Sequence, residues 1–352
     1  MSTYACAALL SRRGWHCDVF APGHTRAADT VTLVLNDVCE TLLYELFPNG
    51  GWDRLGYRLH RSDVLWGHAS QSQRITRPAI AVRREVLLSH LQAQCRQLPH
   101  VVIHDEASPD GDQAAAYAWR INPRSPTPGP PGAIYAGQRV LLASRAHVLA
   151  DADRTCCYIE SVVDGWLFLI PTGGTGAVIQ AMLPGAPQDG EESLQNLLAQ
   201  SWLIAPLING LEEVSGFTAA PRMHLPLAEP RLLRMGEAAV RLEPLSGEGS
   251  AFALRNAILA AAVLTAGSGE EEAVVQQHYQ HRLLRSFLAH LDGCVKFYRQ
   301  AFARHAAWQQ EIMIMQHTHS HVFMTHCPPG EHQLSHRLVD LGCQPWPVSP
   351  WQ

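Results

Sequence analysis

The sequence predicts an α/β fold, and three features of its 352 residues carry this prediction. Near the N-terminus, a helical pattern at 5–13 ends at Gly14 and is followed by a strand pattern at 16–20, as in one half of a β-α-β unit. Strand patterns then follow one another closely between 139 and 183, which is typical of a mostly antiparallel sheet. Beyond residue 250 the pattern is helical.

The other elements follow from periodicity and from the positions of glycine and proline. Helices are expected at about 31–46, 83–95 and 192–204, and a strand at 101–104, whereas the proline-rich segment 125–133 is a loop by composition. The central strands are expected at 139–144, 156–162, 165–170 and 177–183, the last two joined by a turn through Gly173 and Gly174. A short strand at 219–224 precedes helices at 250–265 and 272–315.

Composition and charge exclude several classes of protein. With 47% hydrophobic and 17% charged residues, the chain is expected to be globular and to form more than one domain. No run reaches the roughly 18 apolar residues of a membrane span, and the first arginines follow the apolar stretch instead of preceding it, so we expect neither a membrane protein nor a secretory signal and place the protein in the cytoplasm. A net charge of −5 without a basic stripe argues against nucleic acid.

The nine cysteines have no C-x-x-C spacing and are expected to be free thiols. Cys156 and Cys157 are adjacent in a predicted strand, so their side chains are expected on opposite faces.

The segment 236–249, GEAAVRLEPLSGEG, stands directly before a long apolar helix. Gly236 lacks a Cβ, so a ligand can approach the backbone closely, and the carboxylate of Glu237 can accept hydrogen bonds from sugar-like hydroxyls. Gly247 and Gly249 allow the same approach at the start of the helix, where free N–H groups favour negative charge on a bound ring. The expected ligand is polar along its chain and electron-rich at its head. The alternative interpretation, without a ligand, is a glycine-rich turn before a buried helix.

This segment resembles the second flavin-binding motif of FAD-dependent monooxygenases and tryptophan-halogenase-like flavoproteins. The resemblance implies that Gly236 and Glu237 contact the ribityl chain of FAD, with Glu237 one methylene longer than the usual aspartate. It also implies that a second group of residues lies against the flavin ring. That group is Pro244, Leu245, Ser246, Gly247 and Gly249.

Three further segments support the resemblance. Residues 5–20 are similar to the helix and second strand that follow the dinucleotide fingerprint in this family. Arg84 matches the arginine of a valine-aspartate-arginine motif that approaches the flavin, whereas Arg83 replaces the acid. Residues 164–171, DGWLFLIP, are similar to the Trp-x-Trp-x-Ile-Pro motif of halogenases. Its Trp166 and Phe168 would face the same side of a strand, either as walls of a substrate pocket or as packing in the sheet core.

The fold implied by the resemblance is a three-layer, Rossmann-like FAD-binding domain that here lacks its first strand. A mostly antiparallel β-sheet substrate domain is inserted into it, and a C-terminal helical segment follows. The expected boundaries are 1–110 and 216–267 for the FAD-binding domain, 134–215 for the substrate domain and 268–352 for the helical region.

Two features of the family are missing from the sequence. Met1 stands where the glycine-rich fingerprint should be ending, and Ala21 stands where an acid usually binds the adenosine ribose. The buried residues of one central strand contribute roughly 10 kcal/mol, which is comparable to the stability of a whole domain. We therefore expect that the chain starts too late or is a fragment; the alternative is a degenerate flavoprotein that acts as a binding or scaffold protein.

The expected activity is that of an FAD-dependent monooxygenase that hydroxylates a small aromatic or a peptide-borne substrate, with NAD(P)H or a separate reductase as electron donor. Halogenases of this class rely on a lysine, and the chain's only lysine, Lys296, lies far from the family's position for it, so halogenation is disfavoured. The sequence also leaves open two further possibilities: that the protein is an oxidase or a reductase on the same fold, and that it has a partner protein. The resemblance assigns no catalytic residue.

Histidines gather near the C-terminus without the pattern of a metal site. His317, His319 and His321 alternate, so an extended backbone would place them on one face. No matching carboxylate or cysteine spacing accompanies them, and we expect no metal. The other histidines and the cysteine of this region are His326, Cys327, His332 and His336.

Overall fold

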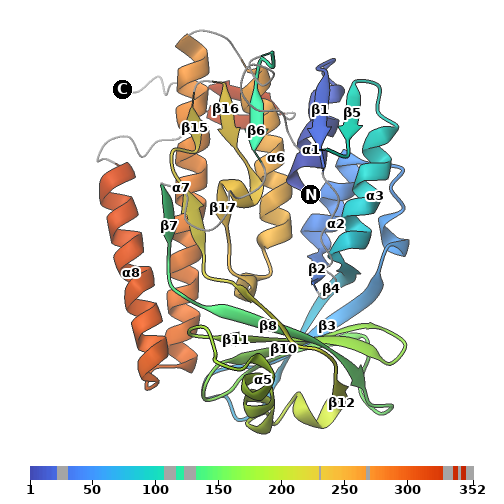
Figure 1. Cartoon of the computed structure of the whole chain (residues 1–352), viewed down its shortest axis with the longest axis vertical. Coiled ribbons are helices and arrows are strands. Elements are labelled where there is room, and N and C mark those ends of the chain that lie inside the picture. The colour runs from blue at the N-terminus through green and yellow to red at the C-terminus, as the bar shows by residue number, and fades with distance from the viewer. Residues whose placement is uncertain are drawn as a thin grey trace.

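The computed structural model describes residues 1–21, 31–106, 116–122, 132–229, 231–266, 270–327, 336–339 and 342–345. A large sheet forms one end of the molecule, and helices with short strands form the rest (Figure 1). The α/β fold that the sequence predicts is therefore confirmed. Within the described ranges, no helix combines the length and the apolar character that crossing a membrane requires.

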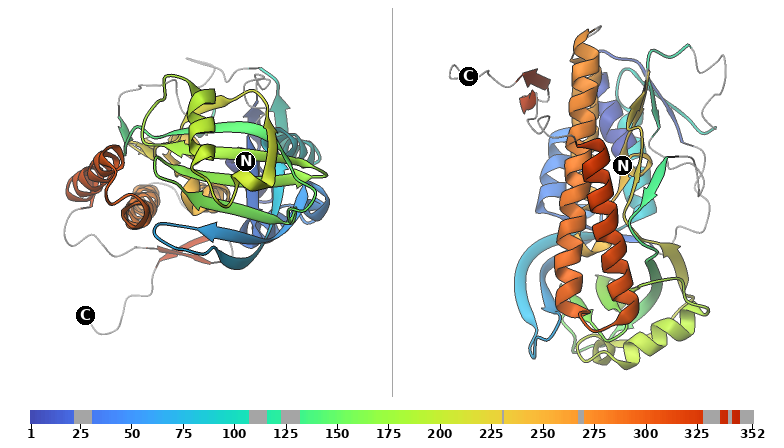
Figure 2. Two further views of the ribbon diagram at one scale, coloured as in Figure 1. Left: turned by 90° about the horizontal axis from the view of Figure 1, so that it is seen from below. Right: turned by 90° about the vertical axis from the view of Figure 1, so that its left-hand side faces the viewer.

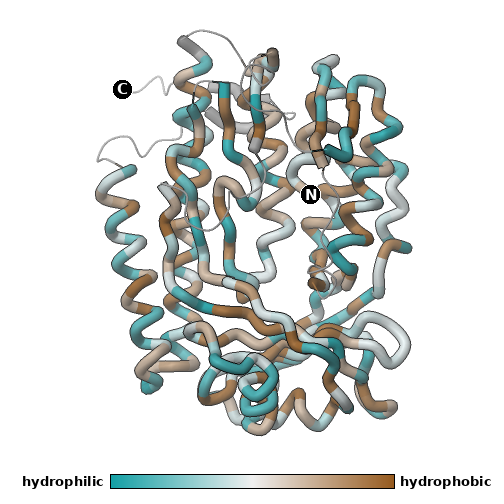
Figure 3. Tube along the Cα trace, in the orientation of Figure 1, coloured by the Kyte–Doolittle hydropathy of each residue, from teal (hydrophilic) through white to brown (hydrophobic). Residues whose placement is uncertain are grey.

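The large sheet has nine strands and occupies the lower part of Figure 1. Its strands pair antiparallel except for β3 with β9, which confirms the mostly antiparallel sheet. Figure 3 shows hydrophobic stretches along its strands. The order is β12 (Ile208–Leu211), β8 (Val140–Val148), β11 (Gly176–Leu183), β10 (Trp166–Gly173), β9 (Cys156–Ser161), β3 (Tyr57–Leu65), β4 (Gln73–Arg83) and β2 (Thr32–Asn36), with β13 (Ser215–Thr218) also on β8.

The prediction of a helix at 31–46 is wrong for the first half of this segment. Thr32–Asn36 form strand β2, which pairs with β4, and only Asp37–Leu46 form helix α2. Asn36 ends the strand and caps the helix, because its Oδ1 accepts a hydrogen bond from the N–H of Cys39 at 3.0 Å. The leucine-rich run fits both periods, and pairing with β4 decides between them.

The helix and strand expected at the N-terminus are confirmed as α1 (Ser2–Ser11) and β1 (Cys17–Phe20). β1 pairs in parallel with β5 (Val101–His104), and α3 (Arg84–Arg96) precedes β5. Helix α1 is buried along its whole length because it contacts both α3 and α6 (Gly249–Thr265). This explains why its composition is apolar all round instead of amphipathic.

Smaller sheets lie between this region and the C-terminal helices. The expected strand at 219–224 is confirmed only in its second half, as β14. One sheet has the order β15 (Ala228–Glu229), β16 (Leu232–Arg234), β6 (Arg120–Asn122), and another has β17 (Val240–Arg241), β14 (Arg222–His224), β7 (Ala133–Tyr135). The last pair is β18 (His336–Val339) with β19 (Gly342–Pro345).

The single helix expected at 272–315 is wrong, because the chain turns back on itself. Helices α7 (Glu270–Ala301) and α8 (Ala306–His326) lie side by side (Figure 2). Phe302 in the turn stacks on Trp308 at 4.4 Å between ring centroids and 11° between planes. The imidazole of His305 caps α8 by accepting from the N–H of Trp308 at 3.4 Å.

The helix expected at 192–204 also ends earlier than predicted. Helix α5 (Gly190–Ala199) starts at Asp189, whose carboxylate accepts from the N–H groups of Glu191 and Glu192. The buried carboxylate of Glu160 then accepts from the N–H groups of residues 202 to 204. These bonds to Glu160 take backbone donors that a longer helix would use internally.

Candidate active site

The segment 236–249 connects the small sheets to helix α6. It forms the turn η4 (Gly236–Ala238), strand β17, the turn η5 (Pro244–Ser246) and the first residues of α6. Gly236 and Gly247 have φ of 60° and 63°, in the left-handed region that favours glycine. A Cβ added at Gly249 would meet no atom within 4 Å, so the backbone at the start of α6 is open to a ligand.

Helices α6 and α7 fix the turn that presents Glu237. The Oδ1 of Asn256 accepts from the N–H of Gly236 at 2.7 Å, and its Nδ2 donates to the hydroxyl of Tyr279 at 2.9 Å. That hydroxyl donates in turn to the carbonyl of Arg234 at 2.7 Å. Asn256 and Tyr279 are buried, so these bonds hold η4 at a set distance from both helices.

A cavity of about 70 Å³, partly open to solvent, lies between the large sheet and η5. Trp166 and Phe168 face the same side of β10, as predicted, and both line this cavity. Four residues of the motif line it from η5 and its end, so the structure brings six predicted residues together; the four are Pro244, Leu245, Ser246 and Gly247. Trp166 also belongs to the core, because it is 1% exposed and its indole N–H donates to the hydroxyl of Tyr298 at 3.2 Å.

Two arginines give this cavity a positive side. Arg77 of β4 reaches towards η5, with its Nη2 3.9 Å from the position of a Cβ on Gly247 and 3.8 Å from Oε1 of Glu248. Arg61 of β3 pairs with Asp153, and its Nε is buried without a hydrogen-bond partner. No acidic residue is among the described lining residues, although each arginine contacts a carboxylate just outside the lining.

Arg84 and Glu237 lie near the start of α1. The amino group of Met1 is buried there, and burial, followed by the charge of Arg84, lowers its pKa to about 5, whereas Glu237 acts in the opposite direction. The amino group of Met1, Arg84 and Glu237 therefore lie close to one another. The free N–H groups at the start of α1 add partial positive charge at this place. The structure thus places both predicted residues beside a helix N-terminus, at the other end of the motif from the cavity.

A buried ion cluster holds the residue that precedes Pro244. The guanidinium of Arg139 is fully buried, and its Nε donates to Oε2 of Glu243 at 2.8 Å. Its Nη1 donates to Glu311 of α8, whose other oxygen accepts from the N–H of Gln138 at 2.8 Å. Gly137, with φ of 122°, leaves space that a Cβ would take from the carboxylate of Glu311. The cluster thereby joins β8, α8 and the approach to η5.

The cluster contains two carboxylates and one guanidinium, so it is expected to bind a proton in the folded state. Burial raises the pKa of Glu243 to about 6 and also raises the pKa of Glu311, although Arg139 opposes both shifts. Because folding raises the pKa of Glu243, its carboxyl contributes most to the free energy of unfolding below the unfolded pKa of 4.5, where it is protonated. This contribution is lost as the pH rises through 6.

We expect Glu243→Gln to change the pH dependence of stability. At pH 4.5 the variant and the wild type should be about equally stable, and at pH 8 the variant should be more stable by roughly 2 kcal/mol, the equivalent of the shift at about 1.4 kcal/mol per pKa unit. Urea unfolding at both pH values measures this difference. The exposed Glu191→Gln is the matched control and should show none; equal behaviour of the two variants would refute the expectation.

A second cavity, of about 350 Å³, lies on the other side of η5, between α6 and α7. Leu245 and Ser246 line both cavities. His290 lines the second one, and its Nε2 accepts from the N–H of Glu243 at 2.9 Å. Burial lowers the pKa of His290 to about 4, so its neutral ring holds the backbone just before Pro244.

The fold is that of FAD-dependent monooxygenases and halogenases, which confirms the fold resemblance seen in the sequence. No protein-family model and no curated protein matches the chain.

Three similar solved structures can be named. Peptidyl tryptophan dihydroxylase QhpG is 18% identical, with a TM-score of 0.70 over 88% of this chain and 75% of its own. The flavin-dependent halogenase CmlS is 15% identical, with a TM-score of 0.74 over 88% of this chain and 65% of its own. HpxO of Klebsiella pneumoniae, solved with FAD and uric acid, is 14% identical, with a TM-score of 0.60 over 91% of this chain and 94% of its own. At these identities the likeness concerns the fold.

Sequence reasoning missed the residues that support the motif from behind. Asn256 had a detectable signal, because it is a polar residue within the apolar helix pattern at 250–265. Arg139 and Glu243 had no such signal, because Arg139 lies 104 residues from Glu243 and 172 residues from Glu311 in the sequence.

His317, His319 and His321 do not lie on an extended backbone, because all three belong to helix α8. His319 is near Asp292 of α7, at 3.5 Å between Nε2 and Oδ2. Among the described residues, no three potential metal ligands come together. His326 ends α8, Cys327 follows it, His336 belongs to β18, and His332 lies outside the described residues.

The cysteines in the described side chains are free thiols, as expected. Cys157 lines the first cavity, whereas Cys156 packs in the core on the other side of the large sheet. The predicted opposite orientation of this adjacent pair is therefore confirmed.

Proposed function

We propose that the chain is an FAD-dependent oxidoreductase that hydroxylates an aromatic or peptide-borne substrate, with NAD(P)H or a separate reductase as electron donor. The observation that carries this proposal is the first cavity, which has the predicted flavin motif on one wall and Trp166 and Phe168 on the other. QhpG, which shares the fold, is a peptidyl tryptophan dihydroxylase, and this supports a peptide-borne substrate.

The residues present fit the flavin half of the cofactor. Gly247 and Gly249 are exposed, and their backbone accepts a planar ring without a Cβ in the way. Glu237 is exposed and would hold the ribityl hydroxyls, while Arg84 and the start of α1 would face the diphosphate. The methyl side chain of Ala21 offers no acceptor for the adenosine ribose, so the fit concerns the flavin half alone.

When bound, FAD would supply the oxidation–reduction chemistry, and the chain would supply position, dryness and charge. Trp166, Phe168 and Leu59 exclude water from the sheet side of the cavity. The first N–H groups of α6 stabilise negative charge at η5. Arg61 and Arg77 would orient a substrate that carries a carboxylate or an ionised hydroxyl.

Hydroxylation is favoured over halogenation because the only lysine is badly placed. Lys296 is exposed on α7 and is absent from the described lining of both cavities. A non-catalytic scaffold is the second candidate, favoured by Ala21, which stands where an acid usually binds the adenosine ribose. An oxidase or reductase would use the same cofactor site, and cytoplasmic location agrees with the free thiols.

Flavin binding and turnover test this proposal in sequence. The purified chain with excess FAD should retain flavin absorbance after gel filtration and gain about 2.7 kcal/mol of stability at a free FAD concentration of a hundred times Kd. The loaded protein should then oxidise NADH or NADPH faster when aromatic compounds or tryptophan-containing peptides are added. If FAD binds but no substrate stimulates the oxidation of NADH or NADPH, the hydroxylase proposal is wrong. If FAD does not bind at all, only the scaffold remains as a candidate function.

A further inference from the structure

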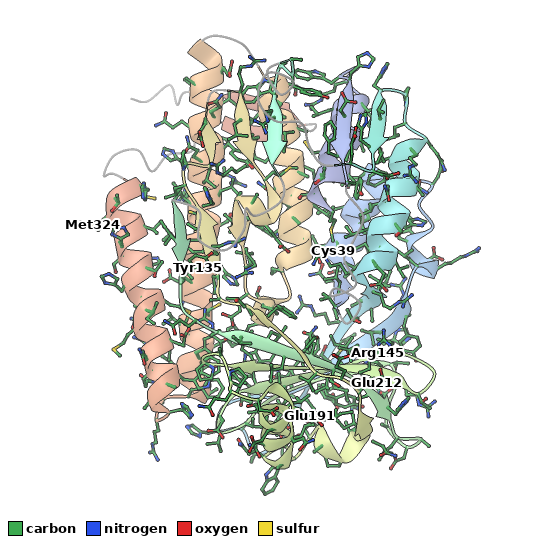
Figure 4. All side chains as sticks on the ribbon, viewed as in Figure 1. Cys39, Tyr135, Arg145, Glu191, Glu212 and Met324 are labelled. Carbon is green, nitrogen blue, oxygen red and sulfur yellow. The ribbon has the colours of Figure 1, made fainter. Side chains whose placement is uncertain are left out.

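The sheet β17–β14–β7 has one apolar and one strongly basic face. Met223, Val240 and Ile134 pack in the main core on one side. Residues alternate along strands, so Arg222 and His224 of β14 point to the other side. Arg222 stands directly opposite Arg241 of β17 and Tyr135 of β7 in the strand register. Tyr135 is labelled in Figure 4, on β7.

Within the part of the chain that the structure describes, the two arginines of this face have carbonyl groups, and no carboxylates, as hydrogen-bond partners. Arg222 is 7% exposed, donates from Nη2 to the carbonyl of Glu237 at 3.0 Å and lies 5.8 Å from the ring centre of Tyr135. Arg241 donates from Nη2 to the carbonyl of Ala220 at 3.3 Å, and its Nε is buried without a hydrogen-bond partner. Neither arginine forms an ion pair with a carboxylate of the described chain, and carbonyl groups leave the net charge of +2 in place.

Such an arrangement is costly without a counter-charge. Like charges directly opposite one another on a sheet destabilise it, and a buried charge requires a partner. Burial and then the charge of Arg222 lower the pKa of Arg241, whereas the carboxylate of Glu237 acts in the opposite direction without forming an ion pair with it. The buried Arg139 differs, because it has two carboxylate partners, and the half-buried Arg234 pairs with Glu229 at 2.8 Å.

His224 adds an unused donor to the same face. Its Nδ1 accepts from Nε of Arg234 at 2.8 Å, so the ring proton lies on Nε2. Nε2 is buried without a partner in a side chain that is 5% exposed. Burial, then Arg234 and Arg222, lower the pKa of His224, which keeps the ring neutral at physiological pH. The face therefore combines two uncompensated guanidinium groups and one neutral N–H donor.

We propose that Arg222 and Arg241, assisted by His224, bind one carboxylate or phosphate group of a ligand. An oxyanion between the guanidinium groups would remove the cross-strand repulsion and accept the free N–H groups of Arg241 and His224. Because Arg222 also holds the carbonyl of Glu237, the bound anion would steady the turn η4. The inference rests on these contacts alone and does not depend on the proposed oxidoreductase activity.

Inorganic phosphate is the probe, compared with chloride at equal ionic strength in thermal unfolding of the full chain. Phosphate at saturating concentration should raise the Tm of the wild type by about 2 to 5 °C. Arg241→Met and Arg222→Met should abolish this shift. In chloride Arg241→Met should be at least as stable as the wild type, since it relieves the repulsion between the two arginines, whereas Arg222→Met also loses the hydrogen bond to the carbonyl of Glu237.

Arg145→Met is the matched control, because Arg145 pairs with Glu212 at 3.6 Å on the surface of the large sheet, away from Tyr135 (Figure 4). It should keep the full phosphate shift. An equal shift in all variants, or no shift in the wild type, would overturn the proposal. So would a loss of stability in Arg241→Met that is the same in chloride and in phosphate, because the arginines would then be purely structural.

A second titration distinguishes two sources of the anion. If saturating FAD leaves the phosphate shift intact, the group belongs to a separate ligand. If FAD removes the phosphate-induced shift in Tm, and Arg241→Met lowers the affinity for FAD at least tenfold, the bound oxyanion is the diphosphate of the cofactor. Both results support an oxyanion site at Arg222 and Arg241; loss of the shift with FAD affinity unchanged in Arg241→Met would contradict it.

Discussion

Arg139→Met is expected to lower the free energy of unfolding by about 3 to 5 kcal/mol at pH 8, because it leaves two buried carboxylates without a cation. Arg139 is fully buried between Glu243 and Glu311, and its Nη2 also donates to the carbonyl of Ala136 at 3.1 Å. The loss should be smaller at pH 5, where both carboxyls can take up protons. Urea unfolding at the two pH values measures both quantities.

The origin of this loss can be separated from simple loss of packing. Adding Glu243→Gln and Glu311→Gln to Arg139→Met removes the uncompensated charges and should recover a large part of the stability at pH 8. The surface variant Arg145→Met should change the free energy by less than about 1 kcal/mol. If Arg139→Met were as mild as Arg145→Met, the cluster would not support η5.

Gly247→Val is expected to weaken FAD binding at least about a hundredfold while the fold persists. A β-branched residue at the φ of 63° costs of the order of 1 to 3 kcal/mol, and its side chain would occupy the backbone surface that faces the ring. Fluorescence titration of FAD measures the affinity, and circular dichroism with thermal unfolding establishes that the fold is intact.

Gly174→Val is the matched control for this experiment. Gly174 has φ of 56°, a Cβ there would meet no atom within 4 Å, and it lies in the turn between β10 and β11. It should suffer similar backbone strain but bind FAD with unchanged affinity. Equal FAD affinity of Gly247→Val and the wild type would show that the ring does not lie against η5.

Several elements were predictable because their signals are local. The helix at α1, the parallel strand β1 and the strands β8 to β11 follow from periodicity and from Gly14, Gly173 and Gly174. Three helices were misjudged for reasons that lie elsewhere in the chain, and two of them differ most from the prediction. Thr32–Asn36 become a strand because β4 offers a partner, and the long C-terminal helix breaks where Phe302 stacks on Trp308. The domain boundaries proposed from the sequence stay a prediction.

The candidate site shows the same division. Gly236, Gly247 and Pro244 set their own backbone geometry, so the sequence by itself determined that the segment 236–249 is a pair of tight turns before a helix. Only the tertiary structure decided that Trp166 and Phe168 face that segment across one cavity, that Arg139 meets two distant carboxylates, and that Arg222 stands opposite Arg241. Backbone preferences act between neighbours in the chain, whereas buried charges and cavity walls depend on which distant strands and helices pack together.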